Sequence, residues 1–290
     1  QQFQNELGNP EKVKFIIGDI QNYDSLFVAM QGVDYVVHTA AMKHVDTCEK
    51  NPYEAVRTNV QGTNNVIHAA LTNNVNKVIF TSSDKAISPT NTYGATKLIA
   101  ERLISSAVSN QLDRKTIFAS VRFGNVMGSR GSVIPLFKER IITERKISVT
   151  DKSMTRFMMT LNQATELTLK ALKEARGGEV FVLKMPVIKL GTLAEILVEE
   201  ICGKYGINDE VAIELIGLRP GEKMYEELMT FDESKSALEL DEMYILPGDA
   251  RITEQYTNMK SARLGTYCSR DQEPLNQQKL RLLLNEASLI

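Results

Sequence analysis

Four side chains able to move or steer a proton lie between Ser82 and Lys97. Asp84 and Lys85 are adjacent, Tyr93 follows nine residues after the acid, and Lys97 comes four residues later. A buried lysine shifts its pKa readily, and a tyrosine serves as acid or base once its pKa is lowered. On a helix, Tyr93 and Lys97 would share one face, so we expect the ammonium to lower the pKa of the phenol. The stretch is a candidate reaction centre; the alternative is a polar loop that leads into an ordinary helix.

A second Tyr-x-x-x-Lys pattern shows that the spacing alone is weak evidence. Tyr256 and Lys260 have the same spacing, but no predicted strand precedes them and no Asp-Lys pair lies upstream. We therefore assign this second pair to a surface helix or loop.

The elements that must position the candidate centre alternate between strand and helix. Buried strands are predicted at Val13–Gly18, Asp34–Thr39, Lys77–Ser82 and Thr116–Arg122. Their apolar runs are continuous, as expected when both faces of a sheet are covered. Helical patterns lie between them, at Tyr23–Met30, Pro52–Asn73 and Tyr93–Asn110. The order predicts an α/β fold with a Rossmann-like doubly wound parallel sheet, whose ligands bind at the carboxyl ends of the strands.

The pattern changes after residue 124 and predicts a smaller C-terminal α/β substrate lobe. Its helices are predicted at Val133–Glu144, Asn162–Ala175, Thr192–Cys202 and Glu222–Met229. Its strands are predicted at Ile147–Thr150, Glu179–Leu183 and Val211–Ile216. After residue 231 we expect a polar, irregular tail with a last helix at Asn276–Asn285. We thus expect a dinucleotide-binding domain at 1–124, a substrate lobe at 125–240 and a C-terminal extension at 241–290.

A glycine-rich phosphate-binding turn is not found near the start of the sequence. A dinucleotide-binding sheet normally opens with a strand and such a turn, whereas here Val13–Gly18 would be the third strand. We therefore expect an N-terminal segment with the first two strands to lie upstream of Gln1. The alternative is that the fold does not bind a dinucleotide.

Several motifs, in order over some 200 residues, resemble the extended short-chain dehydrogenase/reductase superfamily. The similarity is strongest to its nucleotide-sugar 4,6-dehydratases, which act on UDP-N-acetylglucosamine in bacterial polysaccharide synthesis. The motifs are Gly18–Ile20, His38–Val45, Arg57–Thr63, Lys77–Lys85, Tyr93–Lys97, Arg122–Val133, Met154–Phe157 and Leu218–Lys223.

The resemblance implies NAD or NADP as a tightly bound, recycled cofactor and a UDP-sugar as substrate. The implied cofactor contacts are Asp19, Ile20, Ala40, Ala41, Lys43, Asn59, Ser82, Tyr93, Lys97 and Phe123. The implied substrate contacts are Lys43, Asn125, Arg156, Arg219 and Glu222, the last three to the nucleotide and its diphosphate.

The resemblance also implies a division of catalytic roles. Tyr93 would take the proton of the sugar 4-hydroxyl, and Lys97 would contact the nicotinamide ribose. Lys85 would be the base and Asp84 the acid that eliminate water across C5 and C6, with Ser83 near O4. A tyrosine at position 93 fits the branch that inverts C5. The alternatives are a retaining dehydratase, a C4 epimerase and a non-catalytic dinucleotide-binding scaffold.

Composition narrows the classes of partner. The 290 residues carry 34 basic and 36 acidic side chains, a net charge of −2, which disfavours nucleic acid as a partner. No apolar run is long enough to span a bilayer. The three cysteines and three histidines lack the spacing of a disulfide framework or a metal site, so we expect no metal and a cytoplasmic location. His38 is expected to be a hydrogen-bonded core residue, and relatives imply a homo-oligomer.

Overall fold

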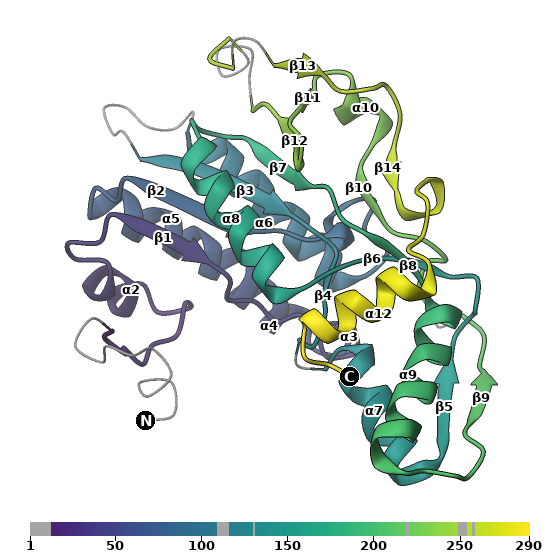
Figure 1. Cartoon of the computed structure of the whole chain (residues 1–290). Helices are drawn as coiled ribbons and strands as arrows, with labels where there is room; N and C mark the ends of the chain where they lie inside the picture. Colours follow the sequence, from purple (N-terminus) through teal and green to yellow (C-terminus); the bar gives the residue numbers. More distant parts are fainter. Residues whose placement is uncertain (1–12, 109–115, 130, 219–220, 249–253, 257–258) are drawn as a thin grey trace.

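The computed structural model describes residues 13–108, 116–129, 131–218, 221–248, 254–256 and 259–290 (Figure 1). A seven-stranded sheet has the order β1-β2-β3-β7-β12-β11-β13. Its parallel strands are β1 (Tyr35–His38), β2 (Lys77–Thr81), β3 (Ile117–Arg122) and β7 (Val180–Leu183). The antiparallel strands β12 (Met243–Leu246), β11 (Leu238–Glu239) and β13 (Lys260–Ser261) continue the sheet.

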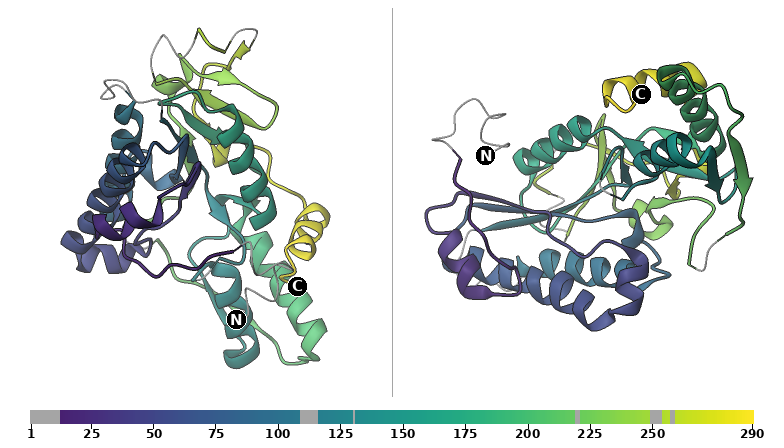
Figure 2. Two further views of the ribbon diagram at one scale, coloured as in Figure 1. Left: turned by 90° about the vertical axis from the view of Figure 1, so that its left-hand side faces the viewer. Right: turned by 90° about the horizontal axis from the view of Figure 1, so that it is seen from below.

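Helices cover both faces of this sheet, which confirms the doubly wound α/β prediction. One layer holds α2 (Tyr23–Ala29), α5 (Gly62–Thr72) and α6 (Thr92–Ala107), and α8 (Leu161–Glu174) lies on the other face (Figure 2). Successive side chains of a strand point to opposite faces. In β2, Phe80 accordingly packs with α5 and α6, whereas its neighbour Ile79 packs with α8. The continuous apolar runs are therefore those of a sheet buried on both sides.

A smaller group of elements packs beside the sheet around its own apolar core (Figure 1). The helices of this group are α7 (Val133–Glu144), α9 (Leu190–Tyr205) and α12 (Gln277–Glu286). Strand β5 (Lys146–Val149) pairs in parallel with β9 (Ala212–Leu215), while β4 (Asn125–Val126), β6 (Thr155–Met159) and β8 (Val187–Lys189) form a second small sheet. The remaining elements are β10 (Glu227–Met229), which pairs with β14 (Tyr267–Cys268), the short helix α10 (Phe231–Ser234) and the 3-10 turn η4 (Ser269–Asp271). The boundaries at 124 and 240 remain predictions.

The strand predicted at Val13–Gly18 is wrong. This segment runs without strand pairing, and the Ile17 side chain is fully exposed. Among the described residues, β1 is the edge strand of the sheet, and Tyr35 and Val37 on it are exposed. An apolar run becomes a strand only where a neighbour takes up its backbone hydrogen bonds, and the described chain places none beside residues 13–18.

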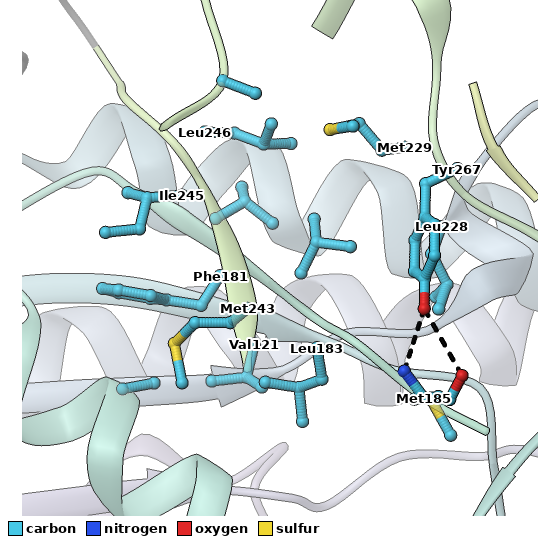
Figure 3. Close-up of a cluster of buried hydrophobic side chains, with 14 of the residues drawn as sticks. Val121, Phe181, Leu183, Met185, Leu228, Met229, Met243, Ile245, Leu246 and Tyr267 are labelled. Atoms are coloured by element: carbon cyan, nitrogen blue, oxygen red, sulfur yellow. Dashed lines mark hydrogen bonds between the residues drawn. The ribbon is translucent and has the colours of Figure 1, made fainter. Parts of the chain in front are cut away.

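The strand predicted at Glu179–Leu183 forms, but in the main sheet and not in the smaller lobe. This strand is β7, which pairs with β3 on one side and with β12 on the other. Figure 3 shows Met243 and Ile245 of β12 packed against Phe181, and the Tyr267 hydroxyl at Met185. The polar tail predicted after residue 231 thus contains strands of the main sheet. Strand β12 is an apolar run of only four residues, and β11 and β13 have two residues each, so their linear pattern is too short to show this.

Three further predictions need correction. The predicted helix Glu222–Met229 is a loop followed by β10, because its side chains bind residues on both sides of a cleft. The predicted helix Pro52–Asn73 is divided into α4 (Pro52–Val56), the π-helical turn η2 (Arg57–Gln61) and α5. Tyr256 is not at the surface: it is 4% exposed, and its hydroxyl donates to Glu179. Lys260 is exposed on β13.

Candidate active site

A cleft of about 480 Å³ opens where β2 and β3 end beside the smaller group of elements. Its walls carry acidic, basic and amide side chains from several separate stretches of the chain. The lining residues that the following argument uses are Asp84, Lys85, Asn125, Arg156, Glu222 and Glu226. Parallel strands end at this edge, as predicted for a ligand site of a doubly wound sheet.

The Asp84–Lys85 pair sits on a 3-10 turn, η3 (Asp84–Ala86), directly after β2. The Ser83 side chain begins this turn: it accepts the Lys85 N–H at 3.3 Å and donates to Asp84 Oδ1 at 2.7 Å. The Asp84 N–H donates to the Phe123 carbonyl at 3.2 Å, which ties the turn to the end of β3. The predicted residues Ser83, Asp84, Lys85 and Phe123 are therefore brought together.

Lys85 is held as an ammonium between two carboxylates. Its Nζ lies 3.0 Å from Asp84 Oδ2 and 4.0 Å from Glu226 Oε1. Burial favours the neutral amine, but the charges of Asp84 and Glu226 outweigh it and raise the pKa of Lys85. The side chain remains 34% exposed, whereas that of Asp84 is 5% exposed. A charged acid-base pair thus faces the cleft.

Tyr93 reaches this pair because α6 can approach η3 closely. Asn91 begins α6 by accepting the Gly94 N–H at 2.8 Å. A Cβ at Gly94 would overlap the Lys85 carbonyl oxygen, so only glycine permits this contact. Tyr93 is 8% exposed. Burial raises the pKa of Tyr93, while the Lys85 ammonium and a hydrogen bond with Ser83 act in the opposite direction.

The expectation that Lys97 lowers the pKa of Tyr93 is therefore wrong in this structure. Lys97 Nζ donates to the Thr81 carbonyl at 2.6 Å and lies 4.3 Å from the centre of the Phe80 ring. Burial lowers the pKa of Lys97 to about 8, opposed by the charge of Glu101. The two residues share a helix, but it is the Lys85 ammonium that acts on the phenol.

Ser82 and Lys97 offer polar groups suited to a cofactor. The Ser82 hydroxyl is buried and, within the described residues, has no hydrogen-bond partner. It follows Thr81, whose carbonyl holds the Lys97 ammonium. Buried polar groups are normally paired, so an unpaired hydroxyl beside a buried ammonium fits a polar ligand such as a ribose or a carboxamide.

Asn59 fixes the loop after β1 to α6. Its Oδ1 accepts the Met42 N–H at 2.8 Å, and its Nδ2 donates to the Met42 carbonyl at 3.0 Å and to Thr96 Oγ1 at 2.9 Å. Asn59 lies in the π-helical turn and is 2% exposed. Such turns are frequent at functional sites. Here the side chain holds the backbone of the predicted cofactor loop.

The other predicted cofactor residues lie on β1's side of the sheet. Asp19 is exposed and accepts the N–H of Gln21 at 2.9 Å. Ile20 packs on α5, where a Cβ at Gly62 would lie 2.6 Å from its Cδ1. Ala40 and Ala41 are in the loop after β1. Lys43 is exposed on the same loop and does not line the cleft, whereas its neighbour His44 does.

Sequence reasoning missed Glu226, the acid opposite Asp84 and Lys85. It is 7% exposed. Both carboxylate oxygens accept from Asn125 Nδ2 at 2.9 Å, and Oε2 accepts the Phe157 N–H at 3.0 Å. Burial and the charge of Asp84 raise the pKa of Glu226, opposed by Lys85, Arg156 and Asn125. The predicted helix at Glu222–Met229 hid this residue, and no local pattern could have revealed it.

Asn125, Arg156 and Glu222 stand at the junction of the cleft with a second hollow of about 320 Å³. Arg156 Nε lies 3.4 Å from Glu226 Oε1, and its Nη2 donates to the Lys223 carbonyl at 2.9 Å. Asn125 and Arg156, two of the predicted substrate contacts, thus both contact Glu226. Arg219, also predicted here, lies outside the described residues.

Arg122 links the elements that carry the site. It is fully buried, and its guanidinium donates to Glu101 of α6 at 2.6 Å, to Glu233 of α10 at 3.0 Å and to the Leu228 carbonyl of β10 at 2.9 Å. The helix of Tyr93 and the strand after Glu226 are therefore joined through one buried cation.

His38 is the hydrogen-bonded core residue that the sequence predicts. It is 4% exposed, and its Nε2 lies 2.9 Å from Thr63 Oγ1. Burial lowers the pKa of His38 to about 3, with a further contribution from the Lys97 charge.

Two features are not found among the described residues. No helix among them combines the length and apolar character needed to span a membrane. No group of three or more potential metal ligands occurs in the same part of the chain.

Comparison with known proteins relates the chain to a family of polysaccharide biosynthesis proteins. A family model described as polysaccharide biosynthesis protein matches residues 1–247. An uncharacterized membrane protein of Methanocaldococcus jannaschii is 45% identical over 283 residues, 97% of this chain and 83% of the relative. A UDP-glucose 4-epimerase of Rickettsia bellii is 42% identical over 286 residues, 96% and 82% of the two chains. The X-ray structure of Pen from Bacillus thuringiensis is 55% identical with a TM-score of 0.92, covering 100% of this chain and 86% of that one.

Proposed function

The chain belongs to the polysaccharide biosynthesis protein family, within the extended short-chain dehydrogenase/reductase superfamily, and on this premise we propose that it is a nucleotide-sugar 4,6-dehydratase. The proposed substrate is UDP-N-acetylglucosamine, with inversion at C5, and the proposed cofactor is NAD or NADP. One observation carries the proposal: the buried Asp84 and the partly exposed Lys85 form an acid-base pair at 3.0 Å beside Tyr93. Oxidation or epimerisation at C4 alone does not need such a pair.

The residues at the end of β2 fit the nicotinamide portion of the cofactor. The unpaired Ser82 hydroxyl and the Lys97 ammonium would hold polar groups of that portion. When bound, the cofactor supplies a positively charged ring that accepts a hydride from C4 and later returns it to C6. Lys97, with a pKa of about 8, can be charged or neutral near physiological pH.

Tyr93 is the proposed acid and base at the sugar 4-oxygen. As a phenolate it takes the proton of the 4-hydroxyl, so that the C4–O bond becomes a carbonyl. Because burial raises the pKa of Tyr93, the phenolate depends on nearby positive charge, which Lys85 supplies from the protein. Ser83 contacts both Tyr93 and Asp84 and would orient the 4-oxygen between them.

The Asp84–Lys85 pair is the proposed catalyst of water elimination. Transfer of one proton across the 3.0 Å contact converts the ammonium and carboxylate into an amine and a carboxylic acid. The amine takes the C5 proton, which the 4-ketone has made acidic, and the electron pair forms the C5–C6 double bond. Asp84 protonates the departing C6 hydroxyl, so that water leaves. The charged pair is then restored. Once the hydride has been returned to C6, a proton from solvent must be added at C5, and in the inverting reaction it arrives on the face opposite to the proton that was removed.

The second hollow is the proposed binding site of the nucleotide. It adjoins the cleft through Asn125, Arg156 and Glu222. A guanidinium at this junction suits a diphosphate, since arginine forks match phosphate oxygens. An arrangement with the nucleotide in this hollow would leave the sugar in the cleft beside Lys85.

A C4 epimerase is the second candidate, favoured by the relatives named UDP-glucose 4-epimerase. A retaining dehydratase and a scaffold without turnover are further alternatives. Proton NMR of the protein with UDP-N-acetylglucosamine and NAD⁺ or NADP⁺ separates them. A new 6-methyl signal, with proton couplings of the L-arabino configuration that results from inversion at C5, supports the inverting dehydratase. A C4 epimer without a methyl signal supports the epimerase. The cytoplasmic location and the homo-oligomeric state remain predictions.

A further inference from the structure

We propose that Glu226 is a positioning residue for Lys85, which holds the amine in the cleft and stabilises the ammonium formed when that amine takes a proton. The proposal deepens the function above and rests on it for the identity of the reaction. Glu226 comes from the loop before β10, 141 residues after Lys85, so the two walls of the cleft meet at this pair of side chains.

The Glu226 carboxylate is fixed on every side. Its oxygens accept from Asn125 Nδ2 and from the Phe157 N–H, and Arg156 Nε lies 3.4 Å away. Its backbone is fixed as well: its N–H donates to Ser269 Oγ at 2.9 Å, and its carbonyl accepts the Ser269 N–H at 2.8 Å. A side chain held by this many partners presents its charge to Lys85 in one defined place.

Charged side chains on both walls of the cleft lie close to Lys85. From its own wall it faces Asp84, with Tyr93 beside it, and from the opposite wall it faces Glu226 at 4.0 Å. Glu226 in turn faces Asp84, Lys85 and Arg156. Asp84 alone would draw the amine to one wall of the cleft. Glu226 attracts the same amine from the opposite wall.

Glu226 therefore makes Lys85 a stronger base as well as an oriented one. A carboxylate near an amine favours the protonated form, so the amine gains a proton more readily when Glu226 is charged. When Asp84 has been protonated for its role as acid, Glu226 is the remaining negative charge at the amine. The role parallels that of a buried aspartate that orients a catalytic histidine and stabilises its cation.

Competitive acetylation of the resting protein with acetic anhydride tests this proposal without turnover. Mass spectrometry of the Lys85 peptide gives its labelling rate at a fixed pH below the midpoint of its titration. In Glu226→Gln the pKa of Lys85 should fall by about one unit or more, which increases the neutral fraction and the labelling rate about tenfold or more. Glu227→Gln is the matched control, since Glu227 lines the same cleft without acting on Lys85.

The proposal is overturned if Glu226→Gln labels Lys85 at the wild-type rate, or if Glu227→Gln accelerates labelling equally. If Glu226→Gln does not fold, Glu226→Asp is tested instead. Its shorter side chain keeps the negative charge but places it farther from Lys85. The labelling rate of Lys85 should then rise, but by less than the tenfold expected when the charge is lost. An unchanged rate in that variant would likewise overturn the proposal. Because no nucleotide sugar is present, the result does not depend on the dehydratase reaction. Where that reaction is observed, Glu226→Gln should lower kcat at least tenfold with little change in KM.

Discussion

Gly94→Ala is expected to disable the site although it adds only one methyl group. The new Cβ would overlap the Lys85 carbonyl oxygen and lie 3.0 Å from Pro89 Cβ and 3.2 Å from the Lys85 carbonyl carbon. Backbone cannot rotate aside as a side chain can, so α6 and η3 must separate by on the order of 1 Å. A displacement of that size can cost about 100-fold in rate, because it moves Tyr93 away from Ser83 and Lys85 together.

The assay is the initial rate of product formation by NMR, together with the midpoint of thermal unfolding. Gly203→Ala in α9 is the matched control, because nothing lies within 4 Å of its added Cβ. That variant should keep its rate and gain up to about 1 kcal/mol in unfolding free energy from the helix preference of alanine. Gly94→Ala with a wild-type rate and an unchanged or higher midpoint would refute the close approach of α6 to η3.

Three other variants test separate parts of the account. Arg122→Leu leaves the Glu101 carboxylate buried without its cation, and should lower the free energy of unfolding by about 3–5 kcal/mol; a loss below about 1 kcal/mol in urea titration would contradict the network. The pKa of His38 is about 3 in the folded chain and near 6.5 when unfolded, so the unfolded state binds more protons between these values. The free energy of unfolding should therefore decrease as the pH is lowered from about 6.5 to 3, by up to roughly 5 kcal/mol. His38→Gln should make this pH dependence weaker, whereas His68→Gln, at an exposed position, should leave it as it is. Tyr93→Phe should slow the reaction at least about 100-fold, and a normal product yield at the wild-type rate would exclude the tyrosine as the proton acceptor.

The parts of the fold that sequence predicts well are those whose pattern is local. Phe80 and Ile79 stand in a continuous apolar run, and such runs identify strands buried on both faces. Helix α7 begins and ends where its periodicity predicts. The failures occur where the outcome depends on distant partners. Residues 13–18 have the composition of a strand but no strand beside them, whereas β12 has a modest pattern and becomes a strand because β7 lies next to it.

The candidate site divides in the same way. Asp84, Lys85 and Tyr93 are close in sequence, and the motifs around them predict one candidate reaction centre. Glu226 is remote from all three and lies in a segment that the pattern assigns to a helix. The protonation states depended on burial and on side-chain direction, which spacing does not report. Lys97 shares a helix with Tyr93 but turns to the Thr81 carbonyl, so the charge that acts on the phenol comes from Lys85.

The measurement that tests the central claim most directly is deuterium uptake at C5 of the sugar in D₂O, compared between the wild-type protein and Lys85→Ala. If Lys85 is the base of the elimination, the wild type forms a 6-deoxy product that carries solvent deuterium at C5. The variant should reduce the cofactor more slowly, because Tyr93 loses the nearby ammonium, so C5 exchange is measured per cofactor reduced in a single turnover. That ratio should fall at least about 100-fold. Equal uptake by both proteins would contradict the assignment of Lys85, and with it the role given to the Asp84–Lys85 pair.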